Sequence, residues 1–224
     1  MPSTSDAPRQ RLTRERVIDA ALEIMDADGS DALTFRSLGR ALGVDHTAFL
    51  RHFRNKDDLI LALADRLLQQ AVDAVEPSDD WRMSLRALSF SVRNTFRRHP
   101  RVATVVAGRT ARSDAEFAGA DIVIGALLAA GLDGAEAASY YRALVDVALA
   151  YAALEASVST LPAADAEGDR RAWTHEYQSV DADRFPHLAS VAEHLPAVDR
   201  QDQFDVAFGL LVDAIEVRVS RGRG

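Results

Sequence analysis

The sequence predicts an all-α protein. Apolar residues recur at intervals of three and four along most of the chain, which is the spacing that places them on one face of a helix. No segment alternates polar and apolar residues for long enough to indicate a strand. With 224 residues and 48% hydrophobic content, the chain is long enough to bury a core. We expect short N-terminal helices followed by a larger helical bundle.

The first two helices are marked by residues that favour helix ends. Residues 1–11 are rich in Ser, Pro and Asp, so we expect a disordered arm there. Thr13 can cap a first helix that Gly29 ends. Its inward positions are Val17, Ala20, Ala21, Ile24 and Met25. Thr34 can cap a second helix that Gly43 stops, because glycine adopts a positive φ at no steric cost. The apolar face of the second helix holds Leu38, Ala41 and Leu42.

Two further helices complete the N-terminal part. A third short helix is expected from about Asp45 to His52, and its inward anchors are Val44, Phe49 and Phe53. Asn55 can cap a long fourth helix, whose i, i+4 stripe is Leu59, Leu63 and Leu67. Pro77, Ser78 and Asp79 then interrupt the helical pattern. We therefore predict a domain boundary that separates residues 12–76 from residues 77–224.

The rest of the chain is also predicted to be helical. The expected helices are 80–98, 101–108, 114–130, 135–158, 187–195 and 202–220. Ser113 and Glu116 match the pattern of a capping box, which supports a helix start at 114. Residues 159–185 are acidic and contain proline, so we expect a mobile connection that can hold one short helix near 171–178.

Charge is distributed unevenly along the chain. The net charge is −8, which argues against indiscriminate binding to nucleic acid. Between Thr34 and Lys56, however, Asp45 is the only acid. The basic residues of this stretch are Arg36, Arg40, Arg51, Arg54 and Lys56. A basic module on an acidic body is typical of a specific DNA-binding protein, although a solvated charged surface gives the same pattern.

Several classes of protein are disfavoured by composition and motifs. There is no cysteine, which excludes disulfides and thiolate chemistry. The first 16 residues lack the apolar stretch of a signal peptide, and the strongest apolar run, 121–132, is too short to span a bilayer. No metal-binding, phosphate-binding or nucleophile motif of a known enzyme class appears. We expect a cytoplasmic protein that is not an enzyme and has no cofactor or metal.

The second and third predicted helices form a helix-turn-helix pattern. A short turn at Gly43 lets one helix cross the other, so that the second can project polar side chains into a major groove of DNA. With the apolar anchors facing inward, the outward or N-terminal positions are Asp45, His46, Thr47, Ala48, Arg51 and His52. The pattern predicts DNA binding, but any small helical hairpin with a glycine turn has the same spacing.

The run from Val17 to Leu68 resembles the DNA-binding domain of the TetR (tetracycline repressor) family. The matching pieces are "AALEIMDADG", "LTFRSLGRALGV", "RHF" and "NKDDLI", in this order. Near the C-terminus, "DRFPHLASVAEHLP" and "FDVAFGLLVDAIEVRV" are similar to the last helices of the tetracycline-repressor branch. The resemblance covers nearly all of residues 12–221.

The resemblance implies a set of DNA contacts. Arg36 would contact bases from the first helix of the motif, and His46, Thr47 and Arg51 would do so from the second. Because arginine can pair bidentately with guanine, Arg36 and Arg51 suit this role chemically. The positions that would bind phosphates are Thr34, His52 and Lys56. Many family members have Tyr where this chain has Leu50, so one familiar contact is missing.

The resemblance also implies that the C-terminal domain binds an inducer and dimerises. Polar candidates for the ligand site are Ser91, Asn94, Arg109, Tyr140, Tyr141, Trp173 and His175. A magnesium-bound tetracycline is disfavoured, because Val106 stands where the family has a metal-binding His and Arg109 lies near the companion Thr. For each candidate, a structural hydrogen bond or a surface position is the alternative.

The last predicted helix has two apolar faces. Its first stripe is Phe204, Phe208, Leu211 and Ile215, and a second consists of Ala207, Leu210, Ala214 and Val217. A helix with two apolar faces favours packing on its own domain and on a partner. We predict a dimer interface made with helix 135–158, although a purely internal helix is the alternative. The predicted interface residues are Tyr151, Phe208, Leu210, Leu211, Ala214 and Ile215.

Together these observations predict a one-component transcriptional repressor. We expect it to bind a palindromic operator in double-stranded DNA as a homodimer and to be released by a small organic ligand. The alternative is a helical adaptor or sensor protein that keeps a vestigial DNA-binding domain and works through protein partners.

Overall fold

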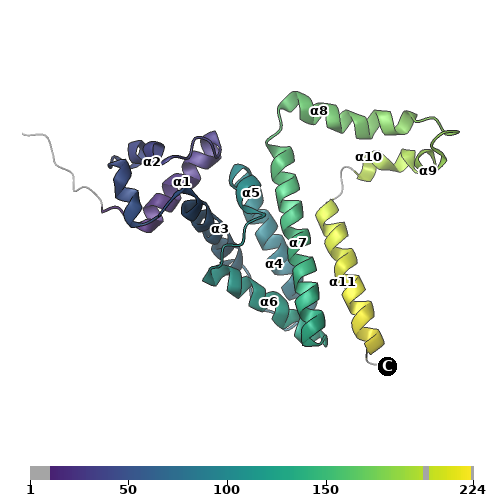
Figure 1. Ribbon diagram of the computed structural model, residues 1–224. Coiled ribbons are helices and arrows are strands. Elements are labelled where there is room, and N and C mark those ends of the chain that lie inside the picture. The colour runs from purple at the N-terminus through teal and green to yellow at the C-terminus, as the bar shows by residue number, and fades with distance from the viewer. Residues whose placement is uncertain (1–10, 199–201, 223–224) are drawn as a thin grey trace, which may run out of the picture.

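The computed structural model describes residues 11–198 and 202–222, which form helices and no strand (Figure 1). The predicted all-α fold is confirmed. The short N-terminal helices lie at one side, longer helices form a bundle in the middle, and a helical arm projects from one end of the bundle. The predicted disordered arm falls, except for Arg11, outside the described residues.

The first two helices begin and end where the sequence predicts. Helix α1 spans Arg14–Asp28, and the Thr13 hydroxyl accepts from the Arg16 backbone N–H at 3.3 Å. Helix α2 spans Phe35–Leu42. Its cap is reciprocal, because the Thr34 hydroxyl accepts from the Ser37 N–H and the Ser37 hydroxyl accepts from the Thr34 N–H. The reciprocal cap fixes the angle at which the chain enters α2.

The turn after α2 depends on two glycines. Gly43 has a φ of 65°, in the left-handed region that favours glycine. Gly39 must lack a side chain for a different reason, because a Cβ there would lie 2.9 Å from the carbonyl oxygen of Val44. This close approach lets the next helix cross α2. Of the predicted apolar face of α2, Leu38 is buried and Leu42 half-buried, but Ala41 is exposed.

The third helix, η1, is a 3₁₀ helix over His46–Arg51 rather than the α-helix expected from Asp45 to His52. The Asp45 side chain accepts from the backbone N–H of Thr47 at 2.8 Å and from its hydroxyl at 2.5 Å. A helix of this length gains little from α-type bonds, so a tight capped 3₁₀ turn can compete. Phe49 is fully buried beneath η1 and stacks on Phe35 at 5.9 Å between ring centroids.

Helix α3, Lys56–Asp73, joins the N-terminal helices to the bundle. The Asn55 side chain caps it by accepting from the Asp58 N–H at 2.9 Å. Its predicted stripe, Leu59, Leu63 and Leu67, is buried. These leucines share one apolar core with α1 and with residues of the bundle such as Phe96 and Val102. The N-terminal helices are therefore packed directly against the C-terminal bundle.

The bundle follows the predicted helices closely. Its members are α4 (Trp81–Arg98), α5 (Pro100–Val106), α6 (Asp114–Ala130), α7 (Gly134–Ser159) and α11 (Gln203–Gly222). The predicted capping box at α6 is half formed. The Ser113 side chain accepts from the Glu116 N–H at 3.3 Å, but the Glu116 carboxylate accepts from the Arg112 N–H at 2.6 Å instead of the Ser113 N–H.

The segment between α7 and α11 differs from the prediction. Its elements are α8 (Ala163–Arg171), the π-helical turn η2 (Ala172–Glu176), η3 (Tyr177–Ser179), α9 (Pro186–Ala189), η4 (Ala192–His194) and α10 (Leu195–Val198). The expected mobile connection is thus largely helical, and the expected helix 187–195 is broken into short turns. Alanine, glutamate and arginine make residues 163–171 good helix formers without an apolar stripe. This arm stands away from the bundle in Figure 1.

None of the described helices is by itself long and apolar enough to cross a membrane, although α7 and Ala163–Ser179 together meet the criteria of length and composition across a bend of 113°.

Candidate DNA-binding surface and ligand cavity

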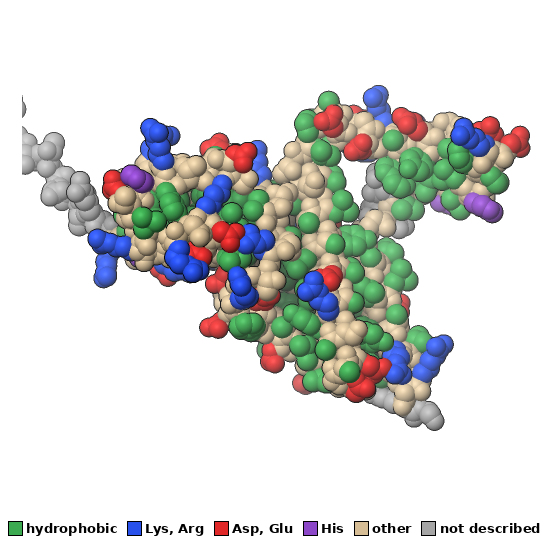
Figure 2. All heavy atoms as spheres, in the orientation of Figure 1, with side chains coloured by type: hydrophobic (Ala, Val, Ile, Leu, Met, Phe, Trp, Pro, Cys, Tyr) green, Lys and Arg blue, Asp and Glu red, His purple; other side chains and the backbone are tan. Residues whose placement is uncertain are grey.

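The seven residues predicted to contact DNA come from the N-terminal ends of α2 and α3 and from both ends of η1. Six are exposed and His52 is half-buried. The exposed ones are Thr34, Arg36, His46, Thr47, Arg51 and Lys56. Lys and Arg side chains stand out over this part of the molecule in Figure 2. The helix-turn-helix thus presents a polar, basic surface, which we call the DNA-binding surface.

The arginines of this surface differ in whether they have a partner. Within the described part of the chain, Arg36, Arg40 and Arg51 make no ion pair or side-chain hydrogen bond. Arg54 is instead held by Asp58, with Nε and Oδ2 2.7 Å apart. The hydrogen bond from Arg54 lowers the pKa of the Asp58 carboxyl. The three unpaired guanidiniums keep their donors free for phosphates or bases.

Three predicted contacts are already engaged within the protein. Lys56 Nζ donates to the carbonyl oxygen of Ser30 at 2.7 Å, at the start of α3, where backbone N–H groups favour anions. The Thr34 hydroxyl belongs to the α2 cap, and the Thr47 hydroxyl donates to Asp45. Hydrogen bonds from the Thr47 side chain and backbone lower the pKa of Asp45. Thr47 must leave Asp45 before its hydroxyl can donate elsewhere.

Sequence reasoning left Arg40 out of the predicted contacts. It lies exposed in the last turn of α2 and, like Arg36, has no ion-pair partner among the described residues. Its position among the basic residues between Thr34 and Lys56 is the sequence feature that could have identified Arg40 as a candidate DNA contact. Leu50, at the position where the resemblance implied a Tyr contact in many relatives, is 57% exposed on η1.

A small cavity lies inside the bundle, with α3 on one side of it. Its volume is about 90 Å³, and its walls come from α3, α4, α6, α7 and the loop after α5. Most of the lining is apolar, including Leu68, Val92, Val123, Leu144 and Leu149. The polar side chains in its wall are Ser89, Arg109, Glu116 and Tyr141. An apolar space with a few polar groups is the usual form of a small-molecule site.

An outer cleft of about 410 Å³ adjoins this cavity. The two share Ala107, Arg109, Glu116, Tyr141, Val145 and Leu149. Arg142 and Asp146 line the outer cleft and pair with each other at 2.8 Å. Arg109, Glu116 and Tyr141 therefore stand where the apolar interior meets the polar mouth. Burial, followed by the nearby Glu116 charge, raises the pKa of the Tyr141 hydroxyl.

Arg109 and Tyr141 are the two predicted ligand residues that line the cavity. Ser91 donates to the Ala71 carbonyl at 2.7 Å, which ties α4 to α3, and Asn94 is exposed. Tyr140 packs against the core beside α11. Trp173 stacks on Tyr177 at 4.6 Å, and both belong to the arm, as does the exposed His175. The sequence did not single out Ser89 and Glu116, because their role depends on the rotation of α4 and α6 about their axes.

Among the residues that the structure describes, no group of three or more His, Asp or Glu side chains is placed to hold a metal ion.

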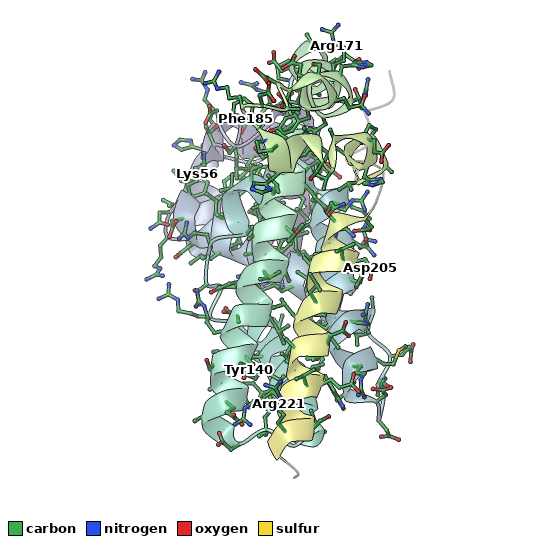
Figure 3. The ribbon with its side chains drawn as sticks, turned by 90° about the vertical axis from the view of Figure 1, so that its right-hand side faces the viewer. Lys56, Tyr140, Arg171, Phe185, Asp205 and Arg221 are labelled. Carbon is green, nitrogen blue, oxygen red and sulfur yellow. The ribbon has the colours of Figure 1, made fainter. Side chains whose placement is uncertain are left out.

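An exposed apolar face runs along α7 and α11. The large apolar residues on it are Leu154, Val158, Val206, Leu210 and Val217, each between 46% and 67% exposed. The two helices lie side by side in Figure 3, and hydrophobic side chains gather along this edge in Figure 2. We call it the α7/α11 outer face.

The predicted interface residues divide between this face and the protein's own core. Leu210 is 67% exposed and Ala214 is exposed, whereas Leu211 and Tyr151 are half-buried. Phe208 and Ile215 are buried among α4, α6 and α7. They fill the protomer's own core, so a partner could not reach them without unfolding this part of the bundle.

Comparison with protein families gives two matches that together cover most of the chain. Residues 17–63 match the family described as bacterial regulatory proteins, tetR family. Residues 75–219 match the tetracyclin repressor-like C-terminal domain.

Similar proteins include several regulators from Streptomyces species. The HTH-type transcriptional repressor DrrR1 of Streptomyces coeruleorubidus is 24% identical over 225 residues, which cover 98% of this chain and 83% of the relative. The transcriptional regulator SCO7222 of Streptomyces coelicolor superposes with a TM-score of 0.79 at 26% identity, over 92% of this chain and 99% of that one. ActR from the same organism, solved in complex with actinorhodin, has a TM-score of 0.81 at 24% identity, over 93% and 99%.

Proposed function

The chain belongs to the tetR family of bacterial regulatory proteins, and we propose that it is a repressor that binds a palindromic operator as a homodimer and leaves it when a small organic ligand enters the bundle. The family consists of transcription regulators and not of enzymes. The observation that carries the proposal is the presence in one chain of a basic helix-turn-helix surface and an apolar cavity that are connected by α3.

Operator binding is supported by the unpaired arginines of the DNA-binding surface. A cation that already has a carboxylate partner gains little from a phosphate, whereas Arg36 and Arg51 have none among the described residues. Both can donate two parallel hydrogen bonds to guanine in the major groove. Lys56, at the start of α3, would bind phosphate and fix the register of the two molecules.

Dimerisation is supported by the α7/α11 outer face. Apolar side chains as exposed as Leu154 and Leu210 favour burial, and two copies of one helix pair can cover each other about a two-fold axis. A dimer would place two DNA-binding surfaces on successive major grooves, about 34 to 36 Å apart. We therefore propose an interface built on Leu210 and Ala214, with Leu154 and Val158 of α7, and without Phe208 and Ile215.

Release by a ligand is supported by the position of the cavity. Its wall includes Ala64, Leu68 and Val72 of α3, the helix that also carries Lys56. A ligand that fits better when α3 has moved would favour the form that does not fit DNA, and this difference in affinity is what couples the two sites. ActR, which shares the fold, has been solved with actinorhodin bound.

DNA binding can be tested without knowing the operator. Duplexes selected from a random pool with the wild-type protein should yield a two-fold symmetric sequence, and gel shifts should then show specific binding to it. A folded protein that selects no sequence would contradict the proposal. Intact dimerisation and ligand binding in that case would favour the adaptor alternative.

The dimer can be tested by a charge on its proposed interface. Leu210→Glu should give monomers in sedimentation and abolish operator binding, because a carboxylate would be buried between the two copies. Leu128→Glu is the matched control, since Leu128 is 49% exposed on α6, away from the α7/α11 outer face. A Leu210→Glu protein that remains dimeric would show that the interface lies elsewhere.

A further inference from the structure

Arg109 connects the cavity to the DNA-binding surface. It lies in the loop between α5 and α6 and lines both the inner cavity and the outer cleft. Its Nη2 also meets the carboxylate of Asp57, at 2.8 Å from Oδ1 and 3.0 Å from Oδ2. Asp57 belongs to the first turn of α3 and follows Lys56 directly. One side chain thus touches the proposed ligand space and the end of the helix that would bind phosphate.

The guanidinium of Arg109 is only partly used by this contact. Both distances to Asp57 involve Nη2, and within the described ranges Nε and Nη1 have no hydrogen-bond partner. An arginine offers five N–H donors in a planar fork. A carboxylate or sulfonate that accepts two hydrogen bonds at once uses Nη2 together with Nε or Nη1, so it has to share Nη2 with Asp57.

The Arg109–Asp57 pair is weak enough to be exchanged. The two side chains are 37% and 56% exposed, and exposed ion pairs contribute little because water and salt screen them. A ligand acid held against the same guanidinium inside a partly apolar site is screened less. Asp57 itself lines neither the cavity nor the cleft, so it can affect a ligand only through Arg109.

The other charges of the site limit where an acid can lie. Glu116 would repel it, and Arg142 is already paired with Asp146 at the rim. An acidic group is therefore placed on the Arg109 side. Glu116, whose Oε2 accepts from the Arg112 N–H, can accept a further hydrogen bond from a ligand hydroxyl.

We propose that the site takes a ligand with an apolar body and one acidic group, and that this group competes with Asp57 for Arg109. This inference rests on the proposed function, and it adds the class of ligand and the contact within the protein that ligand binding would break. When Arg109 turns to the ligand, the Asp57 carboxylate loses its cation. An uncompensated negative charge then lies next to Lys56, where it opposes the approach of a DNA phosphate.

The competition can be measured with two fluorescent probes in the absence of DNA. 8-Anilinonaphthalene-1-sulfonate carries a ring system and an acid, and N-phenyl-1-naphthylamine is the same ring system without the sulfonate. Dissociation constants of both are measured by titration for the wild-type protein and three variants, Asp57→Asn, Arg109→Gln and Asp58→Asn. Asp58→Asn is the matched control, because it removes a neighbouring carboxylate that pairs with Arg54 instead of Arg109. Circular dichroism confirms that each variant is folded.

The changes in affinity are expected only for the probe that carries the sulfonate. Asp57→Asn should tighten the sulfonate probe about two- to fivefold, the range that an exposed ion pair can supply. Arg109→Gln should weaken the same probe by at least this factor. The neutral probe should respond to neither change, and Asp58→Asn should leave both probes unaffected.

Three results would overturn the proposal. If Asp57→Asn leaves the sulfonate probe unchanged, the acid does not compete for Arg109. If both probes respond equally to Arg109→Gln, the arginine contributes shape and not charge. If the wild-type protein binds only the neutral probe, or neither, the ligand class is wrong. None of these results depends on DNA, so they are distinct from a failure to bind an operator.

Discussion

Arginines are used in opposite ways at the DNA-binding surface and at the junction of α4, α7 and α11. Arg93 of α4 is buried, pairs with Glu155 of α7 and donates to Asp202 at 2.7 Å, and its guanidinium lies 4.8 Å from the ring centre of Phe204. Arg36 and Arg51 are exposed and have no such partners among the described residues. A cation with satisfied hydrogen bonds holds its own protein together, whereas an unpaired one is available to a partner molecule.

This contrast predicts that replacing the buried arginine lowers the stability of the fold, whereas replacing an exposed one lowers the affinity for operator DNA. Arg93→Met should lower the free energy of unfolding by about 2 to 4 kcal/mol, because it leaves Asp202 without its cation and Glu155 with only the more distant Arg97. Urea denaturation measures this loss. Arg97→Met is the control, since Arg97 is 54% exposed and lies 3.9 Å from Glu155, and it should cost less than about 1 kcal/mol. Equal losses in the two variants would show that burial is not what gives Arg93 its role.

Arg36→Ala should produce the opposite pattern. We expect a loss of about 1 to 3 kcal/mol in operator affinity and a relaxed base preference, because the side chain can pair with guanine. The free energy of unfolding should change by less than about 0.5 kcal/mol, as is usual for an exposed side chain without partners. Gel shifts on matched and single-base-changed operators, together with denaturation, test both halves. A stability loss without a change in affinity would reverse the comparison.

The helices that carry the DNA-binding surface were easier to predict than the cavity in the bundle. Thr13, Thr34 and Asn55 cap helices through atoms within three residues, so the local sequence is enough to place the ends of α1, α2 and α3. The 3₁₀ form of η1 was not predicted, because it depends on a competition between two patterns of bonding in one short segment.

The C-terminal half depends on choices that the sequence leaves open. Phe208 and Leu210 lie on the same two-faced helix, and only packing against the bundle decides that Phe208 is buried and Leu210 exposed. The cavity residues Ser89 and Glu116 come from separate helices whose relative rotation is a tertiary property. The helical form of the arm was not predicted, because residues 163–171 form a helix without burying one side chain.

Lys56→Ala compares a phosphate contact with a base contact such as Arg36 within the DNA-binding surface. A phosphate contact carries no base information, so the loss should be similar on all sequences, at about 1 kcal/mol. The slope of log affinity against log salt should fall by about 0.9 for each phosphate contact that is lost. Titrations at several salt concentrations on operator and random duplexes measure both. A loss confined to the operator would instead make Lys56 a base contact.

The smallest expected effect is the loss at low pH of the stability that Asp202 supplies at the junction around Arg93. The hydrogen bond from the Arg93 side chain lowers the pKa of the Asp202 carboxyl in the folded protein. Because the folded pKa lies below the unfolded value of about 3.9, this carboxylate stabilises the fold above that pH. The contribution is lost as the pH falls through the folded pKa, since Asp202 then takes up a proton and Arg93 keeps its charge.

Asp202→Asn isolates this contribution. The side chain of Asp202 is 45% exposed, so the stabilisation is modest, and asparagine can still cap α11 as Asp202 does by accepting from the Asp205 N–H. The difference in unfolding free energy between wild type and Asp202→Asn should be largest near neutral pH and should shrink below about pH 4. Urea denaturation at pH 7, 5, 4 and 3 measures this difference in unfolding free energy. A difference that stays constant over this range would mean that Asp202 acts at the junction through its shape rather than through its charge.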